Sequence, residues 1–279
     1  MKQGAIRLRA AREEDLPRLR ALWRESFGSG QLFARLTETC FVPGQVQSSL
    51  VLLEDDVIRS MAFFLPTFWS DAQKGCAPAP CLVGLATDGA RRHQKYASWL
   101  VETACDFMVE KGAGAVWTLL PDEGLELFFS MQGFWTLPRP KAGRWRAADL
   151  PGGASVRRAA PAEYDRVRER LLHGVNHAVA GPLVTAWQRE LAEQKGGGMF
   201  LVRAGGEEGC ALATADGGAV QVRELLCPAA QRPAALRALA EALGREECAA
   251  EAPLGMLRLM NRFAALERPE GYPGCGILL

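Results

Sequence analysis

The sequence predicts an α+β protein with two successive domains that carry the same order of strands and helices. A chain of 279 residues is long enough for two domains, because independently folding domains usually have about 100–200 residues. Residues 148–155 (ADLPGGAS) contain a proline and two glycines, which is typical of a turn or linker. The sequences on the two sides of this segment resemble each other. We therefore predict an N-terminal domain over residues 1–149 and a C-terminal domain over residues 150–279.

The internal repeat begins at Leu8 and returns at Val156. Both copies start with an apolar residue and an arginine, continue with an alanine and an acidic residue, and end on Arg-Leu-Arg or Arg-Val-Arg. Each copy is typical of a short strand, a loop and an amphipathic helix with an acidic residue in its first turn, where the helix dipole favours a carboxylate. The alternative is a chance match in an arginine-rich chain.

The order of the remaining elements is also the same in the two halves. Apolar and β-branched runs predict strands and amphipathic runs predict helices. In the first half we expect strands at 49–54, 57–64, 81–87, 115–120 and 134–137, and helices at 92–111 and 123–131. In the second half we expect strands at 199–203, 209–214 and 220–227, and a helix at 232–247. Each half carries one extra helical segment, at 31–39 and at 182–194. A shared order of elements predicts that both halves are mixed sheets flanked by helices.

The charge and the apolar pattern exclude several classes of function. The 33 basic and 32 acidic residues leave a net charge of +1, which does not favour nucleic acid as a partner. The apolar stretches are far shorter than a membrane helix requires, so we expect no membrane partner. The N-terminus has no apolar signal-peptide core, which predicts a cytoplasmic protein.

The cysteines and histidines do not predict a metal site. The eight cysteines form no C-x-x-C pair and only three histidines are present, so we expect mostly buried free thiols. His173 and His177 have the spacing of metal ligands on one helix face, but Gly174 lies between them and no acidic or cysteine ligand is near in sequence. We interpret them as a surface pair.

A basic turn separates the strand CLVGLATD from the helix that follows it. Residues 89–95 read GARRHQK, and we expect their backbone amides to lie at the N-terminus of the helix. Free amides and the positive end of the helix dipole can hold a pyrophosphate. Arg91, Arg92, His93 and Lys95 would add positive charge. The alternative is a solvated basic loop.

The stretch from Val83 to Leu100 resembles the acetyl-CoA-binding motif of GNAT N-acetyltransferases, in which Arg/Gln-x-x-Gly-x-Gly/Ala follows the fourth strand. The match here is Arg92-x-x-Lys95-x-Ala97. The opening IRLRAAREEDLPRLRALW is similar to the first strand and helix of that family, and LFFSMQGF, at residues 127–134, is similar to its Phe-Tyr-x-x-x-Gly-Phe segment. The resemblance covers about residues 5–140, and its spacing is also similar to the tandem-domain, Eis-like branch.

This resemblance implies two tandem GNAT-like domains, each a mixed, mainly antiparallel sheet flanked by helices. It implies acetyl-CoA as cosubstrate and an amine-bearing small molecule or peptide as acceptor, with the amine attacking the thioester directly. In the family the fourth strand splays from the fifth, and the pantetheine arm of CoA pairs with the free strand edge. The implied cofactor-binding residues are Leu85 and Thr87 on the strand, and Arg92, His93, Gln94, Lys95, Tyr96 and Ala97 around the pyrophosphate.

Two positions depart from the family pattern. Lys95 replaces a glycine that lets the backbone approach phosphate closely. Phe129 replaces the tyrosine that protonates the leaving thiolate, and a phenyl ring has no proton to donate. Ser130 is adjacent but would point elsewhere on a helix. The carboxylates of Asp88, Asp122, Glu123 and Glu126 lie near the expected cleft, but a carboxylate in the first turn of a helix is more often a partner of the helix dipole than a base, so we assign no catalytic residue. A non-catalytic CoA-binding or regulatory protein and a purely structural partner-binding protein stay open as alternatives.

The C-terminal half resembles the family more weakly. Residues 222–228 (VRELLCP) are similar to a GNAT fourth strand, and Glu224 stands where some members carry an acidic residue facing the acceptor. The turn that follows lacks both glycines, and Pro233 removes an amide from it. We therefore expect this half to keep the fold without a cofactor site and to line the acceptor cleft.

Overall fold

The computed structural model describes residues 5–28, 31–40, 49–120, 123–138, 142–215, 217–250, 254–260, 271–272 and 274. The chain forms two compact units. Unit 1 comprises Met1–Trp69, Cys76–Thr136 and Gly255–Pro269, and unit 2 comprises Ser70–Gly75, Leu137–Leu254 and Glu270–Leu279. The predicted boundary between residues 149 and 150 therefore falls inside unit 2, and the units are not contiguous in sequence.

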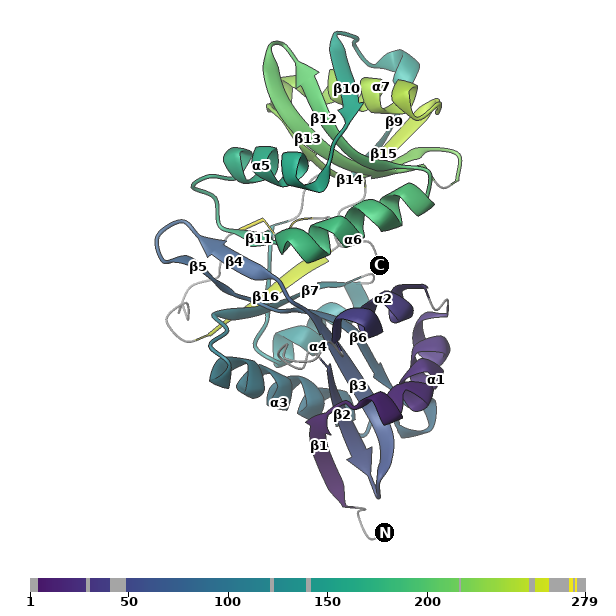
Figure 1. Cartoon of the computed structure of the whole chain (residues 1–279), viewed down its shortest axis with the longest axis vertical. Helices are drawn as coiled ribbons and strands as arrows, with labels where there is room; N and C mark the ends of the chain where they lie inside the picture. Colours follow the sequence, from purple (N-terminus) through teal and green to yellow (C-terminus); the bar gives the residue numbers. More distant parts are fainter. Residues whose placement is uncertain are drawn as a thin grey trace. The chain divides into compact units, whose positions relative to one another are not determined.

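Unit 1 is a seven-stranded sheet with helices on both faces (Figure 1). Its strand order is β1-β2-β3-β6-β7-β16-β8. The strands are β1 (Ile6–Ala10), β2 (Ser49–Glu54), β3 (Val57–Leu65), β6 (Cys81–Thr87), β7 (Ala115–Leu120), β8 (Trp135–Thr136) and β16 (Leu254–Leu259). The helices are α1 (Leu16–Phe27), α2 (Gln31–Cys40), α3 (Tyr96–Glu110) and α4 (Glu126–Met131), with short 3-10 turns η1 (Glu13–Asp15), η2 (Gly89–Arg91) and η3 (Glu123–Leu125). Helices α1 and α2 cover one face of the sheet, and α3 covers the other.

Unit 2 is built on a six-stranded sheet of order β10-β12-β13-β14-β15-β9. These strands are β9 (Gly143–Arg146), β10 (Ala154–Arg158), β12 (Gly198–Ala204), β13 (Glu207–Thr214), β14 (Val220–Leu226) and β15 (Glu247–Ala250). The helices are α5 (Pro161–Leu171), α6 (Gly181–Gln194) and α7 (Arg232–Ala242), with short turns η4 (Ala147–Asp149) and η5 (Ala229–Gln231). A separate three-stranded sheet contains β4 (Phe68–Asp71), β5 (Gly75–Pro78) and β11 (His177–Val179).

The sheet of unit 2 separates two hydrophobic cores, because successive side chains of a strand point to opposite faces. Phe200 and Val202 of β12 pack with Leu239 of α7 in one core. Met199 and Leu201 of the same strand pack with Tyr164, Val167 and Ala192 of α5 and α6 in the other. The unit is therefore a sheet with helices on both faces, as the sequence predicts.

Both large sheets are mainly antiparallel, and each contains a parallel pair at the corresponding place. Strand β6 runs parallel to β7, and β14 runs parallel to β15. Each of these first strands carries one extra residue against its antiparallel neighbour, near Gly84 in β6 and at Arg223 in β14. Such a bulge bends the strand and increases its twist. The mixed α+β fold with mainly antiparallel sheets is confirmed.

The strand that lies beside the parallel pair comes from an unexpected part of the chain in each unit. In unit 1 it is β16, which the sequence analysis placed in the C-terminal domain; in unit 2 it is β9, which was placed in the N-terminal domain. All six residues of β7 are buried, so its outer edge needs a strand partner. The nearby β8 has only two residues and pairs with β16 instead.

Most of the predicted elements are confirmed, some to the residue. Strands β2, β6 and β7 have the predicted bounds. Helix α3 begins at Tyr96, four residues later than predicted, because the preceding loop contains left-handed residues. Helix α7 ends at Ala242, five residues before the predicted end at Glu247, and Glu247 is instead the first residue of β15. Among the described residues, no helix has the length and apolar character needed to cross a bilayer.

The six cysteines with described side chains are all free, and four of them are buried. Cys40 and Cys275 lie outside the described side chains. For the described cysteines, the prediction of mostly buried free thiols is confirmed.

The origin of β16 and β9 predicts how the chain responds to cutting. Expressed as separate fragments, residues 1–149 lack β16 and residues 150–279 lack β9. We expect neither fragment alone to unfold cooperatively, because each has an unpaired strand edge over a buried core. Co-expressed, the two fragments should purify together.

Circular dichroism during thermal unfolding and size-exclusion chromatography measure this result. As a control, joining residues 254–260 to residues 1–138 through a flexible linker should restore a cooperative transition. A monomeric fragment 1–149 with a native-like transition would contradict the assignment of β16.

Candidate functional site

Strand β6 separates from β7 soon after it begins. The two strands pair only at Cys81 with Trp117 and at Leu82 with Thr118. The Thr118 hydroxyl then donates a hydrogen bond to the Leu82 carbonyl at 2.9 Å. Residues 83–87 of β6 continue along β3, but among the described residues no strand pairs with their other edge. The unit 1 sheet therefore contains an open strand edge next to a buried strand.

The bulge in β6 is shaped by a glycine under a tryptophan. Gly84 has φ +62, a left-handed value that favours glycine. A Cβ at this position would lie 2.5 Å from the ring of Trp23, which is buried on α1. The close packing of α1 on the bulge therefore requires glycine here.

The loop between β6 and α3, residues 88–95, contains two left-handed residues that are not glycine. His93 has φ +64 and Lys95 has φ +66. A left-handed residue with a Cβ costs roughly 1–2 kcal/mol, so the surrounding structure imposes these conformations. Lys95 occupies the position where the GNAT motif has glycine. The lysine therefore adopts a backbone conformation that is usually taken by glycine.

The N-terminus of α3 is open to an anion. Lys95 precedes the helix, and no side chain caps it. The first-turn amides, residues 96–98, have no acceptor among the described residues, and this turn contains no acidic residue. Unpaired amides and the positive end of the helix dipole favour a bound anion.

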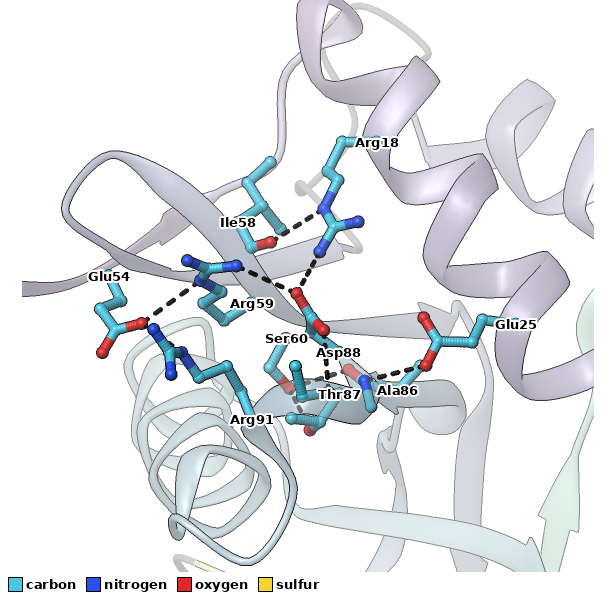
Figure 2. Close-up of polar contacts among 12 residues, drawn as sticks. Arg18, Glu25, Glu54, Ile58, Arg59, Ser60, Ala86, Thr87, Asp88 and Arg91 are labelled. Atoms are coloured by element: carbon cyan, nitrogen blue, oxygen red, sulfur yellow. Dashed lines mark hydrogen bonds and ion pairs between the residues drawn. The ribbon is translucent and has the colours of Figure 1, made fainter.

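Asp88 is the first residue of the loop, and its carboxylate is held by three hydrogen bonds (Figure 2). Its Oδ1 accepts from the Ala90 amide at 3.1 Å, and its Oδ2 accepts from Arg18 at 2.7 Å and from Arg59 at 3.1 Å. Burial acts to raise the pKa of Asp88, but the amide and the two guanidinium groups outweigh burial and lower it. The carboxylate thus ties the loop to α1 and β3.

Glu54 anchors the other end of the loop. Its two oxygens accept from the Tyr96 hydroxyl at 2.8 Å and from Arg91 Nε at 2.7 Å. These contacts, with the nearby Arg59, lower the pKa of Glu54 against partial burial. Figure 2 shows Arg91 turned toward Glu54, on the β2–β3 side of the loop. Arg91 therefore serves the structure of the loop, whereas the sequence analysis counted it among the groups that add charge for an anion.

Arg92 is folded back toward the start of the loop. Its Nε donates to the Thr87 carbonyl at 3.4 Å, and its Nη2 lies 3.8 Å from Glu25 Oε1. The same carboxylate oxygen accepts from the Gly89 amide at 2.8 Å. Glu25 and Arg92 are both substantially exposed, with 43% and 51% of the side chain accessible.

The eight residues implied as cofactor ligands lie along one continuous path of strand, loop and helix start. Their side chains differ in accessibility. Tyr96 is buried, and Thr87 shares a 2.9 Å hydroxyl contact with Ser60. The exposed side chains are those of Arg92, His93, Gln94 and Lys95.

Four further residues shape this loop and are not marked as site residues by any sequence motif: Arg18, Glu25, Glu54 and Arg59. Their partners lie 29 to 70 residues away in the sequence. No local motif marks such contacts. Only Arg18 lies in a segment that the sequence analysis singled out, the repeated Arg-Leu-Arg.

Phe129, at the position of the family's tyrosine, belongs to an aromatic cluster on α4. It is buried and makes edge-on contacts with Phe128 and Phe134, at ring-centroid distances of 5.0 and 5.3 Å. Ser130 beside it is exposed, and Asp122 lies outside the described residues. Among the described residues, no group of three His, Cys, Asp or Glu side chains could hold a metal ion.

The corresponding connection in unit 2 is shorter. Residues 227–231 join β14 to α7, against residues 88–95 in unit 1. No residue in this connection has positive φ. Pro228 precedes η5, and Pro233 lies in the first turn of α7. A proline has no amide to offer an anion.

Glu224 does not face an open cleft in unit 2, so the expected acceptor-lining role is wrong for this residue. It is 3% exposed and is bound by the Tyr164 hydroxyl and by Arg168 Nε, the latter at 3.1 Å. A buried carboxylate is costly unless it is paired, and α5 supplies the pairing groups here. Glu224 therefore has a structural role.

The expected surface pair of histidines is also wrong. His177 is buried on β11, where its Nε2 lies 2.9 Å from Glu169 and its Nδ1 lies 2.6 Å from the Val175 carbonyl. His173 is exposed and follows the end of α5. Helix α5 ends at Leu171, before His173, so the two histidines do not lie on one helix face.

The left-handed loop predicts an unusual response to glycine. Lys95→Gly should raise the free energy of unfolding by up to about 1 kcal/mol, because relief of the left-handed strain exceeds the added flexibility of the unfolded chain. Lys111, at φ −85 after α3, is the control; Lys111→Gly should lower it by about 0.5–1 kcal/mol. Denaturant unfolding compares the two, and a destabilised Lys95→Gly would contradict the strain.

Asp165 on α5 predicts a pH dependence of stability. Burial raises its pKa to about 6, against a hydrogen bond from Thr185 that favours the charged form. Because the folded pKa lies above the unfolded value, near 3.8, this group's contribution to stability falls as the pH rises from about 4 to 6 and stays low above that. Asp165→Asn should therefore stabilise the protein at pH 7.5 and change little at pH 4.

Glu163, on the same helix, gives the opposite case. Its hydrogen bonds from Arg157 and from the Ala160 amide lower its pKa to about 2. Glu163→Gln should reduce stability at pH 7.5, and the difference should shrink as the pH falls through about 4 toward 2. Urea unfolding at several pH values measures both variants. An Asp165→Asn protein that is less stable than the parent at pH 7.5 would contradict the raised pKa of Asp165.

No protein-family model matches this sequence, and no curated protein matches it. Solved structures do match. A GCN5-related N-acetyltransferase from Kribbella flavida is similar with a TM-score of 0.69 at 19% identity, over 92% of this chain and 71% of that one. A GCN5-related N-acetyltransferase from Anabaena variabilis ATCC 29413 gives a TM-score of 0.67 at 9% identity, over 92% and 73% of the two chains.

A third structure, Eis1 from Mycobacterium abscessus, gives a TM-score of 0.61 at 10% identity, over 91% of this chain and 73% of that one. The structural neighbours of this chain are thus GNAT N-acetyltransferases, including an Eis protein, as the sequence motifs suggest. At these identities the likeness concerns the fold, and the chain has the fold of GNAT N-acetyltransferases.

Proposed function

We propose that this protein is an N-acetyltransferase that moves an acetyl group from acetyl-CoA to the amine of a small-molecule or peptide acceptor. The observation that carries the proposal is the path of the chain from β6 to α3. The open edge of β6 leads through a left-handed basic loop to an uncapped helix N-terminus. The fold of acyltransferase neighbours supports the same class of reaction.

The loop suits the pyrophosphate of CoA. Three unpaired amides at residues 96–98 can donate to phosphate oxygens, as helix N-termini commonly do. His93 and Lys95 are exposed on either side of Gln94. Arg92, also exposed, belongs to the same loop. Lys95 differs from the family's glycine in its side chain, but it has a left-handed backbone that glycine adopts readily.

The open edge of β6 suits the pantetheine arm. Residues 83–87 have backbone groups on this edge that do not pair with β7. An extended ligand with amide groups can pair with such an edge as an added strand does. In the proposed complex Leu85 and Thr87 flank the arm, and the thioester lies toward the point where β6 and β7 separate.

The chemistry needs few groups from the protein. The acceptor nitrogen attacks the thioester carbonyl carbon, the carbon–sulfur bond breaks, and the CoA thiolate receives a proton while the nitrogen loses one. Phe129 cannot supply the proton to sulfur. We assign no general base, because the carboxylates that contact the loop are engaged by arginines or amides.

A non-catalytic CoA-binding protein is the second candidate, and the buried Phe129 is the observation that favours it. We further propose that unit 2 binds no CoA. Its shorter, proline-containing connection has no left-handed residue and fewer amides to offer.

Calorimetry with acetyl-CoA on the full chain tests the proposal, followed by a thiol-release assay over a panel of amines. We expect one CoA per chain and thiol release that depends on an amine. Binding without release favours the non-catalytic candidate. Absence of binding removes both, and a stoichiometry of two would show that unit 2 also binds.

Phe129→Tyr gives a direct test of the missing donor. Restoring the hydroxyl should raise the thiol-release rate, by up to the roughly 10²–10⁴-fold that a positioned acid provides. Phe128→Tyr is the matched control, since it adds the same hydroxyl to the neighbouring ring of the cluster. Thermal unfolding of both variants reports any cost of the added group. A Phe129→Tyr rate equal to that of the parent would show that another group protonates the thiolate.

A further inference from the structure

We infer that Glu25 of α1 competes with the phosphate groups of CoA for Arg92 and for the start of the loop, so that it limits cofactor affinity. This inference rests on the proposed function. Glu25 belongs to none of the sequence motifs. Its side chain extends from α1 to the start of the loop, although the two segments are far apart in the sequence (Figure 2).

The Glu25 carboxylate occupies two groups that a phosphate of CoA could otherwise use, the Gly89 amide and the Arg92 guanidinium. Glu25 Oε1 accepts from the Gly89 amide at 2.8 Å and lies 3.8 Å from Arg92 Nη2. Arg92 also bonds backward to the Thr87 carbonyl at 3.4 Å. Its guanidinium is therefore directed to Glu25 of α1 and to the end of β6. A phosphate at the start of α3 would compete with Glu25 for this guanidinium.

Glycine at position 89 makes the contact possible. A Cβ on Gly89 would lie 2.5 Å from Glu25 Oε1. Gly89 does not have positive φ, so its backbone conformation does not require glycine. Glycine is required at this position because the Glu25 carboxylate approaches the backbone so closely.

Glu25 differs from the other two carboxylates that contact the loop among the described residues. The side chains of Glu54 and Asp88 are 14% and 16% exposed, and each engages two arginines. Glu25 is 43% exposed and Arg92 is 51% exposed. An exposed ion pair at this distance contributes little to stability. Glu54 and Asp88 therefore hold the loop, whereas Glu25 can release it.

Glu25 also places a negative charge beside the loop. A carboxylate near a phosphate repels it weakly through water, and the repulsion disappears when the carboxylate becomes an amide. A glutamine at this position could still accept from the Gly89 amide, so the loop would keep that contact. Removal of the charge should therefore free Arg92 without unfolding the loop.

The test is calorimetry of the full chain with CoA and, separately, with pantetheine, which has no phosphate. Glu25→Gln should bind CoA roughly three- to tenfold more tightly than the parent, with pantetheine affinity unchanged. Glu14→Gln is the matched control, because Glu14 is also an exposed carboxylate paired with an arginine, Arg12. It should leave CoA affinity unchanged. In an Arg92→Gln background, the gain from Glu25→Gln should shrink.

A second variant keeps the charge and removes the contact. Gly89→Ala would place a Cβ against the carboxylate and should also tighten CoA binding. Unchanged or weaker CoA binding in Glu25→Gln, or an equal gain for pantetheine, would overturn the inference while leaving the proposed function intact. A full gain that persists in the Arg92→Gln background would overturn the role of Arg92. Failure of the parent and all variants to bind CoA would instead overturn the proposed function.

Discussion

The early end of the parallel pairing between β6 and β7 is the constraint on which the candidate site depends. Because pairing stops at Leu82, the rest of β6 follows β3 alone and bends at the Gly84 bulge. Trp23 packs directly over this bulge, which couples the first helix of the chain to the strand that leads into the loop. The loop and the helix start then stand at an open strand edge instead of inside a continuous sheet.

The charges around the loop fall into two groups with different roles. Arg18, Arg59 and Arg91 are engaged by Asp88 and Glu54, and these pairs hold the loop to the β2–β3 hairpin and to α1. Partly buried pairs of this kind fix geometry because either partner alone would be costly. His93 and Lys95 have no ion-pair partner among the described residues, and their left-handed backbone lets the chain turn sharply between them. A count of basic residues in the sequence therefore overstates the charge that is free to meet a ligand.

The two units share a sheet plan but not a loop. In both, a bulged strand runs parallel to the next strand at the centre of the sheet. In unit 2 the connection that follows is shorter, and the carboxylate on the bulged strand, Glu224, is neutralised by Arg168 and Tyr164. Both Glu224 oxygens are engaged by these groups, so this carboxylate is not free to meet a ligand. This difference supports the proposal that only unit 1 binds CoA.

The sequence by itself determined the local elements, the repeat, the basic loop and its resemblance to GNAT motifs. Strands β2, β6 and β7 were predictable because an apolar run with clear turn signals specifies a buried strand without outside help. The left-handed conformations of His93 and Lys95 were not, since neither residue type signals positive φ. The order of strands in each sheet was decided only by tertiary structure. Residues 254–259 carry no local mark that assigns them to the sheet of residues 5–136, because strand pairing depends on which buried edge lacks a partner. The contacts of Glu25, Glu54 and Asp88 likewise join residues far apart in the chain, and such distances are set by packing and not by sequence spacing.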